Sequence, residues 1–123
     1  MHIYSEQVDE RDSCWEDDAP RFRVYLHSGP GAGGATDTHD LRGGDVLQAI
    51  DWAQEHVPEL GTYAVALVWD RPGATGPERG LVWLVGIDGN STPTSSADER
   101  ALRRMEQRRL NPIELPPSDR VGQ

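Results

Sequence analysis

The chain has 123 residues, with 21 acidic and 12 basic side chains and a formal net charge of −9. This length fits one domain with one core, and no segment approaches the ~20 consecutive apolar residues that cross a membrane. The acidic balance disfavours nucleic acids and anionic membranes, because binding to them depends on cations that neutralise phosphates. The first residues form neither a basic nor an apolar leader, so we expect a cytoplasmic protein.

The residue types also exclude several kinds of chemistry. Every basic residue is an arginine, so the chain lacks a lysine for a Schiff base or for a phosphate-binding P-loop. Cys14 is the only cysteine, which rules out an internal disulfide and a multi-cysteine metal site. We expect no cofactor.

The first segment, residues 1–20, holds seven acids against Arg11 and shows no hydrophobic period. We interpret it as an acidic, loosely ordered arm whose end is attached to the body by Trp15. A single domain follows over residues 21–110. Residues 111–123 contain three prolines and are expected to form a flexible tail.

Strict alternation begins at Arg21 and predicts a half-buried antiparallel strand, with Phe22, Val24 and Leu26 on its buried face. The glycine-rich run 29–34 then favours a turn or loop. Residues 35–41 alternate weakly, and we expect them to return as an edge strand that completes a hairpin.

A helix is expected from Asp45 to about Val57. Asp45 can cap its first turn, with Gln48 closing a capping box. Its apolar stripe contains Val46, Ile50, Ala53 and Val57, flanked by Leu47 and Ala49. Trp52 lies about 120° from the stripe centre, so it either packs against the arm or a loop or anchors a partner.

Residues 62–70 and 81–88 are apolar on both faces and rich in β-formers, and the turn-rich segment 71–80 separates them. They are predicted to pair as a hairpin of central strands. We expect one face to combine both strands in a single layer: Tyr63, Val65, Leu67 and Trp69 beside Leu81, Trp83, Val85 and Ile87.

A second helix is predicted over residues 97–110, with Ser96 and Glu99 as its capping box. One stripe of this helix carries Arg100, Arg104 and Arg108. The stripe is a candidate docking surface for an acidic partner. The alternatives are a solvated helix face or a surface that holds the acidic arm.

These elements predict an α+β fold in which a small antiparallel sheet, in β-β-α-β-β order, has one amphipathic helix on a face and a peripheral C-terminal helix. The second apolar face of the hairpin is then left to the C-terminal helix, to the arm or to another subunit.

No motif for catalysis stands out. The run 29–34 fits G-x-G-x-x-G, but the next helix begins too late to place its amides on a phosphate. His27, Asp37, His39 and Asp40 could meet across the first hairpin and bind a divalent metal, or they could simply face solvent. Asp70 and Asp88 could meet for acid–base work, or cap turns.

The leading hypothesis is a non-enzymatic protein-interaction module with an acidic surface, which self-associates or binds a partner protein through an apolar sheet face, Trp52 and the arginine stripe. The rival is a small-ligand- or metal-dependent enzyme that uses the glycine-rich loop and the region of His27 and His39. A third reading is acidic mimicry of nucleic acid.

Overall fold

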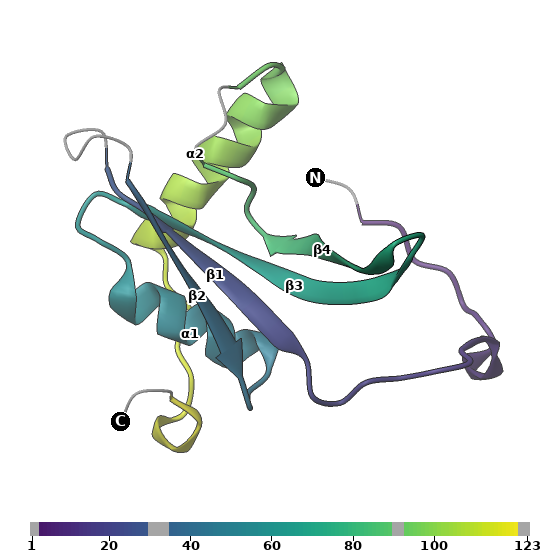
Figure 1. The fold of residues 1–123 in the computed structure, drawn as a ribbon. Coiled ribbons are helices and arrows are strands. Elements are labelled where there is room, and N and C mark those ends of the chain that lie inside the picture. The colour runs from purple at the N-terminus through teal and green to yellow at the C-terminus, as the bar shows by residue number, and fades with distance from the viewer. Residues whose placement is uncertain (1–2, 30–34, 90–92, 121–123) are drawn as a thin grey trace.

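The computed structural model describes residues 3–29, 35–89 and 93–120. A four-stranded antiparallel sheet in the order β2-β1-β3-β4 forms its centre, with helix α1 against one face and helix α2 beside β3 (Figure 1). The α+β class and the β-β-α-β-β order are confirmed. The elements are η1 Glu10–Asp12, β1 Arg21–His27, β2 Thr36–Arg42, α1 Val46–His56, β3 Thr62–Gly73, β4 Gly76–Val85, α2 Ser96–Leu110 and η3 Pro117–Asp119.

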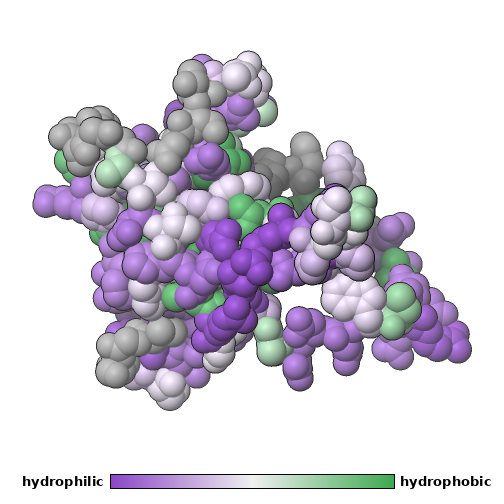
Figure 2. Space-filling view, in the orientation of Figure 1, coloured by the Kyte–Doolittle hydropathy of each residue, from purple (hydrophilic) through white to green (hydrophobic). Residues whose placement is uncertain are grey.

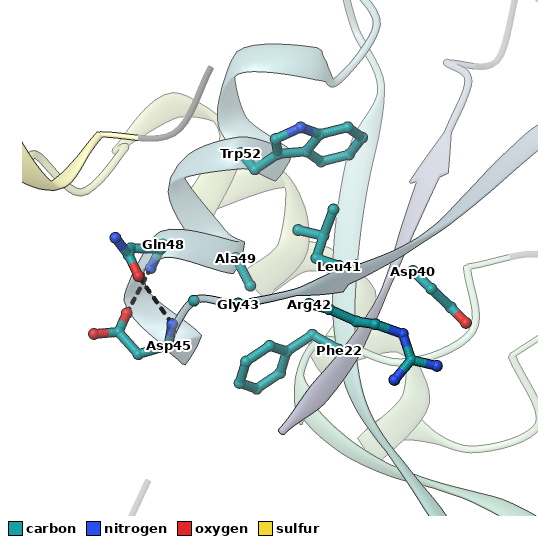
Figure 3. A pocket seen from close by; sticks show the side chains of 10 residues that line it. Phe22, Asp40, Leu41, Arg42, Gly43, Asp45, Gln48, Ala49 and Trp52 are labelled. Carbon is teal, nitrogen blue, oxygen red and sulfur yellow. Dashed lines mark hydrogen bonds between the residues drawn. The ribbon is translucent and has the colours of Figure 1, made fainter. Parts of the chain in front are cut away.

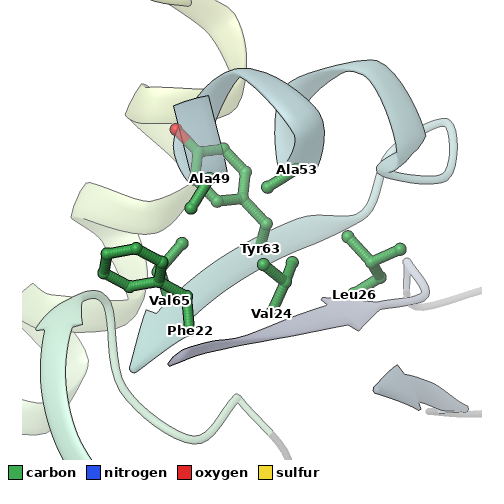
Figure 4. Close-up of a cluster of buried hydrophobic side chains, with 7 residues drawn as sticks. All are labelled: Phe22, Val24, Leu26, Ala49, Ala53, Tyr63 and Val65. Carbon is green, nitrogen blue, oxygen red and sulfur yellow. The ribbon is translucent and has the colours of Figure 1, made fainter. Parts of the chain in front are cut away.

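The core lies between the sheet and α1 (Figure 4). The alternation of β1 buries its even-numbered side chains, and β1 occupies the middle of the sheet between β2 and β3. Helix α1 meets these strands through two alanines, whose short side chains let the helix approach closely. The buried cluster consists of Phe22, Val24, Leu26, Ala49, Ala53, Tyr63 and Val65.

The capping box predicted for α1 is present. The Gln48 amide donates to the Asp45 carboxylate over 2.9 Å, and the Asp45 amide donates to the Gln48 side chain over 3.0 Å. Of the two residues that flank the predicted stripe, Ala49 is buried whereas Leu47 is half exposed. The buried stripe therefore centres on the alanines rather than on the larger residues.

The β3–β4 hairpin is longer than predicted, and its turn contains only residues 74 and 75. This turn pairs Leu67 with Val82 and Val68 with Leu81. Leu81 and Trp83 therefore lie on the face opposite Leu67, and the single layer predicted for them is wrong. A tight turn sets strand register, and a shift of one residue reverses which face a side chain occupies.

Strand β4 is also an edge strand rather than a central one, because β3 is the one strand that pairs with it in the described part of the chain. A β-bulge interrupts the pairing near its end, where Val65 opposes Val85 but Ala66 opposes Trp83, so that Leu84 is the extra residue. The chain leaves the sheet at Gly86, whose φ of +79° suits glycine.

Helix α2 begins one residue earlier than predicted. Ser95, not Ser96, is its N-cap and accepts from the Asp98 amide over 3.1 Å. The Asp98 carboxylate accepts in turn from the Thr94 amide and hydroxyl. Both serines fit the capping pattern. The hydrogen bonds from Thr94 to Asp98 favour Ser95 as the cap.

Residues 111–120 run back along α1. The Gln54 side chain exchanges two hydrogen bonds with the backbone of Ile113, of 3.0 and 2.7 Å, and the Gln48 side chain donates to the Asp119 carbonyl over 3.1 Å. The flexibility expected for residues 111–123 stays a prediction. In the described ranges, neither helix has the length and apolar character that a bilayer span requires.

Met105 attaches α2 to the sheet and is 1% exposed. A Cβ atom at Gly86 would lie 3.1 Å from the Ala64 Cβ and 3.3 Å from the Met105 Cε, so these residues are tightly packed. Met105→Ala should lower the free energy of unfolding by about 2–5 kcal/mol, because it leaves a cavity. Urea denaturation measures this loss, and the exposed Gln107→Ala on the same helix is the matched control. Equal midpoints for both variants would show that α2 does not depend on this contact.

Candidate functional site

His27 is buried, and both of its ring nitrogens have partners. Its Nδ1 lies 3.2 Å from the Thr36 hydroxyl, and its Nε2 accepts from the Gly89 amide over 3.2 Å. An accepting Nε2 carries no proton, so the imidazole is neutral and Nδ1 is its donor. Burial lowers the pKa of His27, and the charge of Asp88 opposes that shift.

The four candidate metal ligands do not converge. Asp37 and His39 lie on the α1 side of β2, where the His39 Nε2 is 3.2 Å from the Asp37 carboxylate. Asp40 and His27 lie on the opposite side of the sheet, and Asp40 binds arginines there. The described residues contain no group of three or more histidine, cysteine or acidic side chains arranged to hold a metal ion.

Trp52 packs between two histidines at the margin of the core. Its ring is stacked on His56 with centroids 3.9 Å apart, and His39 of β2 lies 5.0 Å away on a tilted plane. It also lines a pocket of about 320 Å³ beside Leu41 and the capped start of α1 (Figure 3). Trp52 thus packs against β2 rather than against the arm or a loop, and partner binding by it stays a prediction.

The arginine stripe of α2 is only partly at the surface. Arg100 is exposed, whereas Arg104 and Arg108 are half-buried and line a small cavity of about 170 Å³ with Met105. The positive charge of Arg108 also acts on Tyr63, where it opposes the rise in pKa that burial causes. These two arginines therefore help to pack α2, and docking by the stripe stays a prediction.

Residues 10–20 of the acidic arm lie beside the β3–β4 hairpin, not along α2 (Figure 1). Trp15 attaches the arm there, with its ring centroid 5.8 Å from that of Trp69. The expectation that Trp15 would hold the arm to the body is therefore met, but the surface it contacts is β3. Most of the glycine-rich run lies outside the described residues, so its interpretation as a phosphate-binding loop is not tested.

The face of the sheet opposite α1, which we call the second face, is mixed rather than apolar. Asp40 accepts from Arg23 and from Arg21, each over 2.7 Å. These bonds, above all the one from Arg23, lower the Asp40 pKa to about 2. Tyr25 and Trp83 lie beside this cluster, with ring centroids 5.0 Å apart. This cluster could not be predicted from the sequence, because it depends on the register of β1 with β2.

A second charged pair lies further along β3, where Arg79 donates to Asp70 over 2.8 Å. This hydrogen bond lowers the Asp70 pKa. Asp70 lies within β3, where Arg79 donates to its carboxylate, and the acid–base role considered for Asp70 and Asp88 stays a prediction.

A cavity of about 870 Å³ separates the arm from β3. Figure 2 shows the arm standing off the body with an opening between them. We call this cavity the slot. Its lining comprises Trp15, Glu16, Asp17, Ala19, Pro20, Arg21, Arg42, Leu67, Val68, Trp69, Asp70, Arg79 and Val82.

Comparisons with known proteins identify no relative. No family model matches the chain, and neither the curated proteins nor the solved structures contain a significant match. The site must therefore be interpreted from its own geometry.

The burial of neutral His27 predicts a pH dependence of stability. Its folded pKa lies below the unfolded value of about 6.5, so stability is complete above pH 6.5 and falls as the pH drops towards the folded pKa. His27→Gln offers a similar donor and acceptor without titrating and should flatten this part of the curve. Melting temperatures between pH 5 and 7.5 provide the measurement, and parallel curves for the two proteins would contradict the assignment.

Proposed function

We propose that the chain is a non-enzymatic protein-interaction module that associates with a second copy of itself through the edge of β4. The observation that carries this proposal is the exposure of three consecutive apolar residues on an unpaired strand edge. Val82, Trp83 and Leu84 are 43%, 37% and 43% exposed. An apolar edge with free backbone donors and acceptors is a ready template for another strand.

The opposite edge of the sheet supports this choice by contrast. β2 has the sequence TDTHDLR, with charged or polar side chains at six of its seven positions. Charges on an edge strand oppose pairing with other chains. The sheet thus has one edge that resists association and one that favours it.

A second copy suits the β4 edge for reasons of symmetry and charge. An antiparallel edge is self-complementary, because a twofold axis normal to the sheet brings β4 against its own copy. Two chains of net charge −9 repel each other, so contact is favoured where acids are absent. Residues 80–86 have the sequence GLVWLVG and carry no charge. The neighbouring residues Asp70 and Arg79 neutralise each other.

The proposal predicts a concentration-dependent dimer. Sedimentation of the full chain should give twice the chain mass at high concentration. Leu84→Glu should shift the equilibrium to the monomer, because it places a carboxylate at the interface of two acidic chains. Leu84→Thr is the matched control, because it shortens the side chain without adding charge and should still dimerise. Thr38→Glu places the same charge on the β2 edge and should also leave the dimer intact.

A chain that sediments as a monomer at all concentrations would overturn the proposal. So would a Leu84→Glu variant that remains as dimeric as the wild type. Circular dichroism of each variant confirms that it is folded.

A further inference from the structure

Helix α2 and the segment that follows β4 enclose a small cavity of about 170 Å³, which we call the α2 pocket. The residues of α2 that line it lie three, four and seven positions after the first of them, a spacing that places them on one face of the helix. The lining consists of Gly86, Ile87, Ala101, Arg104, Met105 and Arg108.

The pocket exists because two of its residues are small. Ala101 contributes only a methyl group from the helix, and Gly86 contributes no side chain from the facing segment. Met105 is buried and forms the inner wall, and a Cβ atom at Gly86 would lie 3.3 Å from its Cγ. The pocket is therefore a space between two arginines that a larger residue at position 101 would fill.

Arg108 has a buried donor without an acceptor. Its Nε is covered by other atoms, and no residue that the structure describes accepts a hydrogen bond from it. The Nε of Arg109 is buried in the same way, but Arg109 does not line the pocket. Leaving a buried donor unpaired costs free energy, so such groups normally find a partner in the protein, in water or in an ion. Arg104 has a further interaction of its own, so Arg108 is the residue that lacks a partner.

The pocket is positively charged within an acidic protein. Two of its six lining residues are arginines and none is an acid, although the chain as a whole has a net charge of −9. The guanidinium group of Arg108 also lies close enough to the buried Tyr63 for its charge to act on that hydroxyl. Water screens a charge less at the margin of a core than at the open surface, so an anion is attracted more strongly there.

We propose that the α2 pocket binds a phosphate group, either as the free ion or as the end of a small phosphate monoester. Arg108 donates to the phosphate oxygens, and Arg104 adds positive charge on the same side. The planar guanidinium group suits this ligand because it can donate two parallel N–H bonds to two oxygens of one phosphate. Because the Nε is covered, binding includes a turn of the Arg108 side chain that brings this donor to the pocket.

The size of the pocket selects a small ligand. Pockets for drug-sized molecules have volumes of about 300–1,000 Å³. The α2 pocket, at about 170 Å³, holds an ion or a terminal group rather than a whole nucleotide. Two guanidinium groups also favour a dianion with several acceptor oxygens over a single carboxylate.

Calorimetric titration of the full chain with inorganic phosphate, at constant ionic strength, tests the proposal. The expected result is saturable binding at one site. Arg108→Gln should weaken it at least about tenfold, because the charge-assisted hydrogen bonds are lost. Arg103→Gln removes the same charge from an exposed position of α2 and should bind as the wild type does. Acetate, with one charge, should bind at least about tenfold more weakly than phosphate.

A second variant tests the pocket without removing either arginine. Ala101→Met fills the space between them and should also weaken phosphate binding at least about tenfold. Ala97→Met makes the same change one turn earlier, at an exposed position, and should leave binding unchanged. Circular dichroism confirms that each variant is folded.

Glycerol phosphate distinguishes the two forms of the ligand. Competition with inorganic phosphate shows that the pocket accepts a monoester, whereas binding of inorganic phosphate alone identifies the free ion. Three outcomes would overturn the proposal: no saturable binding of phosphate, equal affinities for phosphate and acetate, or wild-type affinity in both Arg108→Gln and Ala101→Met.

The α2 pocket and the β4 edge can be tested independently. Leu84 does not line the pocket, so Leu84→Glu should bind phosphate as the wild type does. Phosphate binding by a chain that is monomeric at all concentrations would contradict only the self-association proposed above.

Discussion

The extension of β3 beyond β1 is the constraint on which the functional surfaces depend. β1 has seven residues and begins after Pro20, whereas β3 has twelve. Among the described residues, the last part of β3 pairs with β4 alone. A two-stranded ribbon is marginally stable alone, so this part of the sheet gains from any strand that joins it. The arm contacts the ribbon through the rings of Trp15 and Trp69.

Charge then distinguishes the two edges. The β4 edge is uncharged over residues 80–86 and suits a surface of like composition, which is why we assign it to a second copy. On the β1 side of the ribbon the slot is lined by three arginines and three acids, so its lining carries no formal net charge. The contact that we propose at the β4 edge would form through backbone pairing.

Much of the fold could be predicted from sequence because its signals are local. The alternation of β1 and the capping box at Asp45 each specify an element within a few residues, and the structure confirms both. The hairpin register could not be predicted in the same way. Segment 71–80 is rich in glycine and proline and indicates a long loop, yet Pro72 and Pro77 pair within the strands. Because the loop was predicted to be too long, Leu81 and Trp83 were assigned to the wrong face of the sheet.

The surfaces of functional interest were harder to predict because they depend on pairing between distant segments. Asp40 was a candidate metal ligand, but the β1–β2 register places it between two arginines. The position of the slot depends on three features together: where β1 begins, how the arm runs and how far β3 extends. Pro20 has no backbone N–H group to donate. It was the one signal in the sequence that could have indicated where the pairing of β1 with β3 stops.

Hydrogen exchange of the backbone amides of β4 tests most directly whether a second copy pairs with the β4 edge of the β3–β4 ribbon. Alternate amides of residues 80–85 point away from β3. We expect this outward set to exchange slowly in concentrated protein and rapidly after dilution, whereas the exchange rates of the amides bonded to β3 should not depend on concentration. Rapid exchange of the outward set at every concentration would contradict it.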